Sequence, residues 1–330
     1  ALLHVYPLPK LLRGVSVQHV AADVEWLRAQ ALERAAPMES KWSTAPVEEL
    51  TQFGAAMLAP RLQSSGSRLV INDSRDVHYL LLYSNQCVHV FIDEAIISCA
   101  SLSLLSIADR QVLGLQGGKD GVCVDLGLLR SSSLFLKALL SIEFPLLADD
   151  LCPEPSADWL VRHLTRMQEK GFCRTQVSLA GSSADDRSGS IRLFDVKKLQ
   201  MFSQFVYPFV EACWLVGLVC CTLSHPRPEH TAMDRITRVA EHLLGSGIVL
   251  YQQVTNLDML RNGIALMKEF QYITRSNGVA PPTLALSSTQ PVQSLQSFVS
   301  RANAMRCKPW EGSTDAILDY INTLPLAAKL

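Results

Sequence analysis

The stretch LLLYSNQCVHVFIDEAIISCA, residues 80–100, decides how the first part of the chain is interpreted. β-branched and aromatic residues cluster on both sides of the turn-forming triplet Ser-Asn-Gln, which indicates strands at about 77–83 and 87–91 joined as a hairpin. Apolar residues resume a helical spacing directly afterwards. With a further strand expected at about 68–72, the sequence predicts a short β region that leads into a helix.

The same stretch places a histidine close to two carboxylates. His89 precedes Asp93 by four residues and Glu94 by five. A histidine oriented by a carboxylate can act as a general base, so an acid–base pair is one interpretation. Carboxylates at the start of a helix are also favoured by the helix dipole and by the free N–H groups, without any substrate. We therefore interpret His89 as a structural histidine and Asp93 and Glu94 as helix-start residues.

The order of two helices followed by two strands across a polar loop occurs three times. The first copy has helices at 17–34 and 47–62, before the strands described above. The later copies have helices at 126–144, 156–170, 234–244 and 256–270, and strands at 173–181, 190–194, 271–274 and 283–288. This order is the winged-helix arrangement. The sequence thus predicts an α+β fold that is mainly helical with short β-hairpins, arranged as tandem winged-helix-like modules.

Three domains are expected from this pattern. Residues 1–110 contain helices, a β-hairpin and the helix that follows it. Residues 111–204 contain a helix pair and a hairpin, and residues 205–330 form a helical C-terminal part. These boundaries follow the loops between the repeated patterns.

One segment is apolar and long enough to be considered as a membrane-spanning helix. Residues 205–223, FVYPFVEACWLVGLVCCTL, are largely apolar and approach the ~20 residues that a spanning helix needs. Pro208 and Glu211 lie inside the segment, and an ionisable residue is costly in a bilayer. We predict a buried core helix, and membrane insertion is the alternative.

The composition narrows the classes of protein that fit the chain. Apolar residues make up 48% and charged residues 18% of the 330 residues, below the roughly 25% charge of ordinary soluble domains. The chain therefore has apolar surface to bury in its core or against a partner. The net charge is −1, and the expected second helices at 46–61 and 156–170 are not strongly basic. These features argue against nucleic-acid binding and against attraction to an anionic membrane surface.

The cysteines and glycines do not form a recognisable catalytic or metal site. The nine cysteines include no C-x-x-C pair, so free thiols in a reducing compartment are expected. Cys220 and Cys221 lie in the most apolar segment, which lowers thiol reactivity. Gly245-Ser246-Gly247 lacks the spacing of a nucleophile elbow, and Gly118-Lys119-Asp120 lacks that of a phosphate-binding loop.

Metal ligands are not indicated either. His225 and His230 flank a proline-containing turn, and a third ligand at a characteristic offset is missing from the sequence. The residues therefore predict no catalytic, cofactor-binding or metal-binding side chains, and no cofactor.

The stretch at 80–100 also carries a family resemblance. YSN at 83–85, HVF at 89–91, EAI at 94–96 and the following Cys99 resemble the C-terminal region of the mitochondrial glycerol-3-phosphate acyltransferases, the second mitochondrial type more than the first. Weaker matches keep the family's order along about 15–300: GVSVQHVAADVEW at 14–26, EKGF at 169–172, LQMFSQFVYPFVEA at 199–212 and LALSST at 284–289.

The resemblance implies a parent enzyme rather than an activity of this chain. Members of the family transfer an acyl group from acyl-CoA to glycerol 3-phosphate at the cytosolic face of the mitochondrial outer membrane, using a His-x4-Asp motif and a Phe-Pro-Glu-Gly block. Here His19, His89 and His230 have Asp at the fourth following position instead of the fifth, and Phe144-Pro145 is followed by Leu146. No catalytic residue can be transferred to these positions.

Two interpretations follow. In the first, the chain, which starts at Ala1 without Met, is a fragment: the non-catalytic C-terminal region whose partner is the missing N-terminal acyltransferase domain and which reaches the membrane through the parent protein. In the alternative, it is a freestanding adaptor that binds proteins through winged-helix-like modules.

Overall fold

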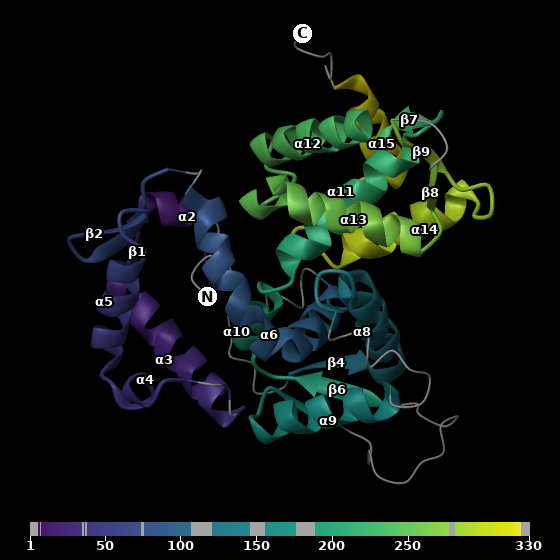
Figure 1. Cartoon of the computed structure of the whole chain (residues 1–330). Helices are drawn as coiled ribbons and strands as arrows, with labels where there is room; N and C mark the ends of the chain where they lie inside the picture. Colours follow the sequence, from purple (N-terminus) through teal and green to yellow (C-terminus); the bar gives the residue numbers. More distant parts are fainter. Residues whose placement is uncertain are drawn as a thin grey trace. The chain divides into compact units, whose positions relative to one another are not determined.

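The structure is a computed structural model in which residues 6, 8–34, 36, 38–73, 76–106, 121–145, 156–175, 189–276 and 281–324 are described. These residues form an α+β fold, mainly helical, with small antiparallel sheets of three strands each (Figure 1). The chain divides into two compact units, Ala1–Ile92 with Tyr251–Gln253, and Asp93–Leu250 with Val254–Leu330. The predicted fold class is confirmed.

The first unit contains one complete module of the predicted kind. Its elements are α2 (Leu8–Arg13), β1 (Val15–Ser16), α3 (Val17–Glu33), α4 (Ser40–Thr44), α5 (Val47–Met57), β2 (Leu62–Ser65) and β3 (Arg68–Ile71). The sheet order is β1-β3-β2, with Val15 opposite Leu69 and Leu62 opposite Ile71. These four residues are buried and form the module's core together with residues of α2 and α3.

The predicted hairpin at 77–83 and 87–91 is wrong. Helix α6 (Asp76–Ser103) covers both segments, and the hairpin of the module is formed earlier by β2 and β3 across a turn at Gly66. The α6 sequence contains neither glycine nor proline, so its Ser-Asn-Gln triplet does not interrupt the helix. A long apolar run without such breaks can be a buried helix as well as a pair of strands.

The second module follows the predicted order. Its elements are β4 (Val122–Asp125), α8 (Leu126–Leu140), α9 (Ser156–Glu169), β5 (Cys173–Thr175) and β6 (Ser190–Leu193), followed by α10 (Val196–Ser203). The sheet order is β4-β6-β5. The carboxylate of Asp125 accepts a hydrogen bond from the Leu128 N–H at 2.7 Å and so caps α8 at its first turn.

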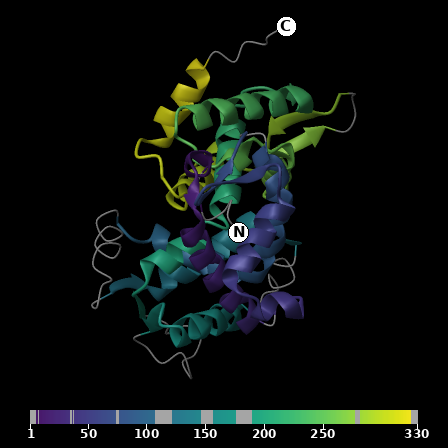
Figure 2. The same ribbon diagram turned by 90° about the vertical axis from the view of Figure 1, so that its left-hand side faces the viewer.

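The third module repeats the order around one additional central helix. Its elements are α11 (Tyr207–Cys221), β7 (Arg227–Pro228), α12 (Glu229–Gly245), the 3-10 helix η3 (Gln252–Thr255), α13 (Leu257–Glu269), β8 (Ile273–Ser276), β9 (Thr283–Leu286), α14 (Val292–Ala304) and α15 (Thr314–Thr323). The sheet order is β7-β9-β8, and Figure 2 shows the β8–β9 hairpin in yellow-green. Both later hairpins were predicted, whereas the short strand that precedes the first helix of each module was not.

Helix α11 is the core of the third module. Every residue of Tyr207–Cys220 is buried, and α12, α13, α14 and α15 pack against it (Figure 1). In the part of the chain that the structure describes, no single helix is long and apolar enough to cross a membrane. The pair α10 and α11 reaches that length and composition together, but the two helices are bent by 57°.

Two glycines set the distance between α11 and its neighbours. A Cβ atom on Gly217 would lie 2.9 Å from Val299 Cγ2 of α14, and one on Gly263 of α13 would lie 2.8 Å from Val216 Cγ2. Both distances are shorter than ordinary contacts, so the absence of a side chain permits the close packing.

Replacement of Gly217 should therefore destabilise the protein. Gly217→Val is expected to lower the free energy of unfolding by about 1–3 kcal/mol, because the new side chain overfills the interface of α11 with α14. Urea unfolding followed by circular dichroism measures this change. Gly245→Ala is the matched control, because a Cβ there has no neighbour within 4 Å; an equal loss in both variants would contradict the packing argument.

Candidate functional site

Asp93 is held by two side chains of helix α9. Trp159 Nε1 donates a hydrogen bond to Asp93 Oδ1 at 2.8 Å, and His163 Nε2 lies 3.4 Å from Asp93 Oδ2. Trp159 and His163 are four residues apart and therefore project from the same face of α9. The carboxylate singled out in the sequence thus does meet a histidine, but the partner is His163 and not His89.

Further charged side chains surround this contact. Arg166 Nη1 of α9 lies 3.5 Å from Glu94 Oε1, and Lys137 Nζ of α8 lies 4.5 Å from the centre of the Trp159 ring. Glu94 and Lys137 are almost fully buried, at 2% and 1% exposure. The group is called the Asp93 cluster below and comprises Asp93, Glu94, Lys137, Trp159, His163 and Arg166. It joins α6, α8 and α9 at one point.

Burial, rather than the charges of the Asp93 cluster, has the largest influence on the pKa of His163. Burial lowers the pKa of His163 from its ordinary value; Asp93 and Glu94 oppose this shift, whereas Arg166 adds to it. The Nδ1 atom of His163 is buried and has no hydrogen-bond partner among the described residues. A general base must reach the proton that it removes. Nε2 faces Asp93 and Nδ1 is covered, so the Asp93–His163 pair forms a contact between α6 and α9.

The His163 contact predicts a pH dependence of stability. The unfolded chain, with the ordinary pKa near 6.5, binds protons before the folded protein does, so stability is present above that pH and is lost as the pH falls below it. His163→Gln is expected to reduce this loss, measured as the urea midpoint between neutral and mildly acidic pH. His230→Gln on the exposed face of α12 is the control, and identical pH profiles for wild type and His163→Gln would refute the prediction.

The interpretation of Asp93 and Glu94 as helix-start residues is wrong. Both lie well inside α6 (Asp76–Ser103) and not in its first turn. The helix dipole, which favours carboxylates in the first turn, therefore does not stabilise them. His89 lies one turn earlier on the same helix and is exposed. Asp93 and Glu94 are instead contacted by side chains of α9. Sequence spacing within α6 could not reveal these contacts.

The other candidate residues occupy structural positions. Burial raises the pKa of the thiols of Cys220 and Cys221 to about 12, which agrees with the expected low reactivity. His225 and His230 are both exposed, on either side of β7. The described residues contain no group of three or more metal-ligating side chains.

Of the two glycine motifs considered in the sequence, one ends a helix and the other lies outside the described residues. Gly245-Ser246-Gly247 closes helix α12: Ser246 Oγ donates to the carbonyl of Leu243 at 3.1 Å, and Gly247 has a φ of +70°. This is a helix C-terminus, where glycine provides the left-handed conformation. Gly118-Lys119-Asp120 lies outside the described residues.

A second buried charge cluster was not predicted. Arg306 Nη2 lies 3.3 Å from Glu211 Oε1, and both side chains are completely buried. Glu211 Oε2 accepts a hydrogen bond from the Leu250 N–H at 3.0 Å, and Arg306 donates to the carbonyl of Ile248. The guanidinium also lies 3.7 Å from the centre of the Trp214 ring. Glu211 was recognised as unusual in an apolar helix, but its partner lies 95 residues away.

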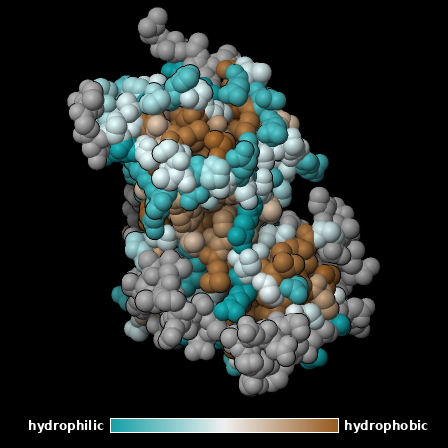
Figure 3. Space-filling model, turned by 90° about the vertical axis from the view of Figure 1, so that its right-hand side faces the viewer, coloured by the Kyte–Doolittle hydropathy of each residue, from teal (hydrophilic) through white to brown (hydrophobic). Residues whose placement is uncertain are grey.

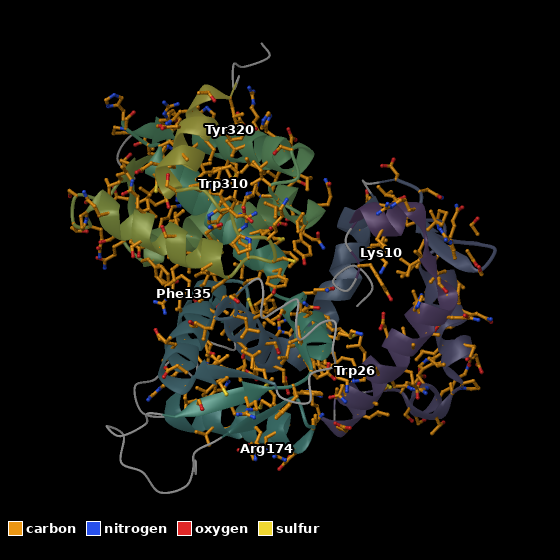
Figure 4. All side chains as sticks on the ribbon, turned by 180° about the vertical axis from the view of Figure 1, so that it is seen from behind. Lys10, Trp26, Phe135, Arg174, Trp310 and Tyr320 are labelled. Atoms are coloured by element: carbon orange, nitrogen blue, oxygen red, sulfur yellow. The ribbon has the colours of Figure 1, made fainter. Side chains whose placement is uncertain are left out.

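Asn303 extends this cluster to the loop after α14. Its Oδ1 accepts from Arg306 Nη1 at 3.1 Å and from the Trp310 N–H at 2.9 Å, and its Nδ2 donates to the Trp310 carbonyl at 2.9 Å. Figure 4 labels Trp310 in the third module. Burial lowers the pKa of Arg306, and Glu211 opposes that shift. The pair thus connects α11 to two loops of the third module.

Removal of one member of the Glu211–Arg306 pair should destabilise the protein. Arg306→Met leaves the buried Glu211 carboxylate without this cation and is expected to lower the free energy of unfolding by about 3–5 kcal/mol. The double variant Glu211→Gln/Arg306→Met, which keeps an acceptor for Leu250, should lose less than Arg306→Met alone. Chemical denaturation of both variants measures the difference, and an equal or larger loss in the double variant would argue against the pairing.

The repeated order of strand, two helices and two strands defines an α+β protein of tandem winged-helix type. The family described as glycerol-3-phosphate acyltransferase C-terminal region matches residues 8–276, from α2 to the end of β8. The chain belongs to this family. The comparison with curated proteins gave no match.

Proposed function

We propose that the chain is the non-catalytic C-terminal region of a glycerol-3-phosphate 1-O-acyltransferase. The parent reaction converts acyl-CoA and glycerol 3-phosphate to lysophosphatidic acid in phospholipid and triacylglycerol synthesis. The family match over 8–276 carries the proposal. It is supported by the sequence, which contains neither the His-x4-Asp motif nor the Phe-Pro-Glu-Gly block.

The Asp93 cluster supports the non-catalytic assignment. Its histidine is the buried group in the described structure that comes closest to a carboxylate-oriented base. The free ring nitrogen of His163 is covered by protein, so an alcohol substrate cannot approach it in this conformation. Proton removal from glycerol 3-phosphate would therefore depend on residues of the acyltransferase domain.

The partner in this proposal is the acyltransferase domain of the parent enzyme. Helix α5, the second long helix of the first module, exposes Phe53 and Met57, the latter at 68%. Helix α5 also contributes to a groove of about 430 Å³, lined mainly by small and apolar residues of α5 and the sheet, although Phe53 and Met57 do not line it. Glu48 and Glu49 occupy the first turn of α5, which disfavours a nucleic-acid backbone as the partner. The face of the second unit in Figure 3 also carries apolar patches.

The cellular location follows from the same proposal. We place the chain at the cytosolic face of the mitochondrial outer membrane through its parent protein, and we assign it to the second mitochondrial type. The dense match at 83–99 supports this assignment.

Enzyme assays test the proposal directly. The isolated chain should release no CoA from acyl-CoA in the presence of glycerol 3-phosphate, whereas an acyltransferase domain with the His-x4-Asp motif should be active when it is joined to this chain. Turnover by the isolated chain would overturn the non-catalytic assignment.

A binding measurement tests the partner surface. Met57→Ser should weaken co-purification of the chain with the acyltransferase domain, because it removes an exposed apolar contact on α5. Glu48→Ser on the same helix is the matched control and should bind as the wild type does. Equal binding by all three proteins would show that α5 does not form the contact.

The adaptor hypothesis is the second candidate. The apolar surface of α5 on a winged-helix module favours it, since such a surface suits a protein partner. The coding transcript separates the two hypotheses: a His-x4-Asp motif encoded upstream and in frame supports the acyltransferase, and a start codon next to Ala1 supports the adaptor.

A further inference from the structure

The sheet of the second module has one buried and one solvent-facing surface. Val124, Ile191, Leu193 and Cys173 are buried on the inner surface. The alternate positions face outward, and the strand register places Cys123 opposite Arg192 and Arg192 opposite Arg174. The side chains of Cys123, Arg192 and Arg174 therefore project from the same surface at neighbouring positions across β4, β6 and β5. Figure 4 shows Arg174 on the edge strand β5.

Arg174 and Arg192 form a like-charge pair on the outer surface of the sheet, and no acidic side chain among the described residues pairs with either. Directly opposite like charges on neighbouring strands repel each other. Within the described residues, the side chain of neither Arg174 nor Arg192 makes an ion pair or a hydrogen bond. By contrast, Arg275 on β8 of the third module lies 2.8 Å from Glu229. Asp125, which projects from the same surface as Cys123, is already engaged in capping α8.

The position of Arg192 is fixed by the backbone beneath it. Gly121 has a φ of +58°, and a Cβ atom there would lie 2.6 Å from Arg192 Cγ. The arginine stem therefore packs directly over the glycine. Its Nε atom is buried and lacks a partner among the described residues. A buried donor of this kind is normally satisfied by a hydrogen bond, so the site has an unused donor as well as uncompensated charge.

We propose that Arg174 and Arg192 form a binding site for a phosphate group. A guanidinium presents paired N–H donors that match two oxygens of a phosphate, and two guanidiniums on adjacent strands can share one phosphate dianion. The anion removes the repulsion between the arginines. The phosphate belongs either to a soluble phosphate ester or to a lipid headgroup. This site is independent of the acyltransferase proposal, because it rests on the sheet register alone.

Cys123 reports on the occupancy of the site. The thiol is exposed and lies next to Arg192, so a bound phosphate shields it from the neutral reagent iodoacetamide. The 330-residue chain is treated in inorganic phosphate or in sodium chloride of equal ionic strength. Alkylation of Cys123 is then measured by mass spectrometry of its peptide, and the melting temperature is recorded in both solutions.

The expected result is slower alkylation of Cys123 and a higher melting temperature in phosphate. Arg174→Gln/Arg192→Gln should lose both effects, and Arg192→Gln alone should weaken phosphate binding about tenfold or more. The double variant should also melt at a higher temperature than wild type in sodium chloride, because the repulsion is gone. Arg275→Gln, on the corresponding hairpin of the third module, is the matched control and should retain both phosphate effects.

Vesicles identify the source of the phosphate. Sedimentation of wild type, but not of Arg174→Gln/Arg192→Gln, with vesicles of phosphatidylcholine and phosphatidic acid assigns the site to a lipid headgroup. Protection by inorganic phosphate without vesicle binding assigns it to a soluble ester. The proposal is overturned if phosphate changes wild type and the double variant equally, which is the general effect of a salt excluded from protein surfaces, or if neither phosphate nor vesicles produces an effect.

Discussion

The third module depends on one buried ion pair. Helix α11 is buried on all sides, and its single carboxylate, Glu211, is fully removed from water. Such a charge is tolerated only when a partner and further hydrogen bonds compensate for the lost hydration. Arg306 supplies the charge and Leu250 supplies a backbone donor. These groups come from distant parts of the chain, so the pair forms only when the loops after α12 and α14 pack against α11.

The same scaffold carries different surfaces in its three copies. The first module exposes apolar residues on α5, whereas the second carries Arg174 and Arg192 opposite each other on the outer surface of its sheet. In the third, the corresponding hairpin neutralises Arg275 with Glu229. Core positions on the inner face of each sheet stay apolar because they are removed from water, while the outer positions are free to differ. Repetition of the fold therefore does not imply repetition of function.

The Asp93 cluster shows why composition alone is a weak guide to catalysis. A carboxylate and an imidazole lie 3.4 Å apart, as they do in many active sites, and a lysine lies over the ring of the neighbouring Trp159. The decisive property is access: His163 is covered, and its pKa is lowered mainly by burial. A carboxylate that orders a buried histidine and a tryptophan serves the packing of three helices.

The sequence by itself determined the α+β class, the repeated helix-helix-hairpin order, the buried character of 207–220 and the family, because these depend on local periodicity, turn residues and short motifs. Only the tertiary structure decided that 77–91 is part of helix α6, because an apolar run without glycine or proline suits either a strand or a helix until its packing is known. It also decided which side chains meet: Asp93 with His163, and Glu211 with Arg306. These partners are 70 and 95 residues apart, and no local pattern specifies contacts at that separation.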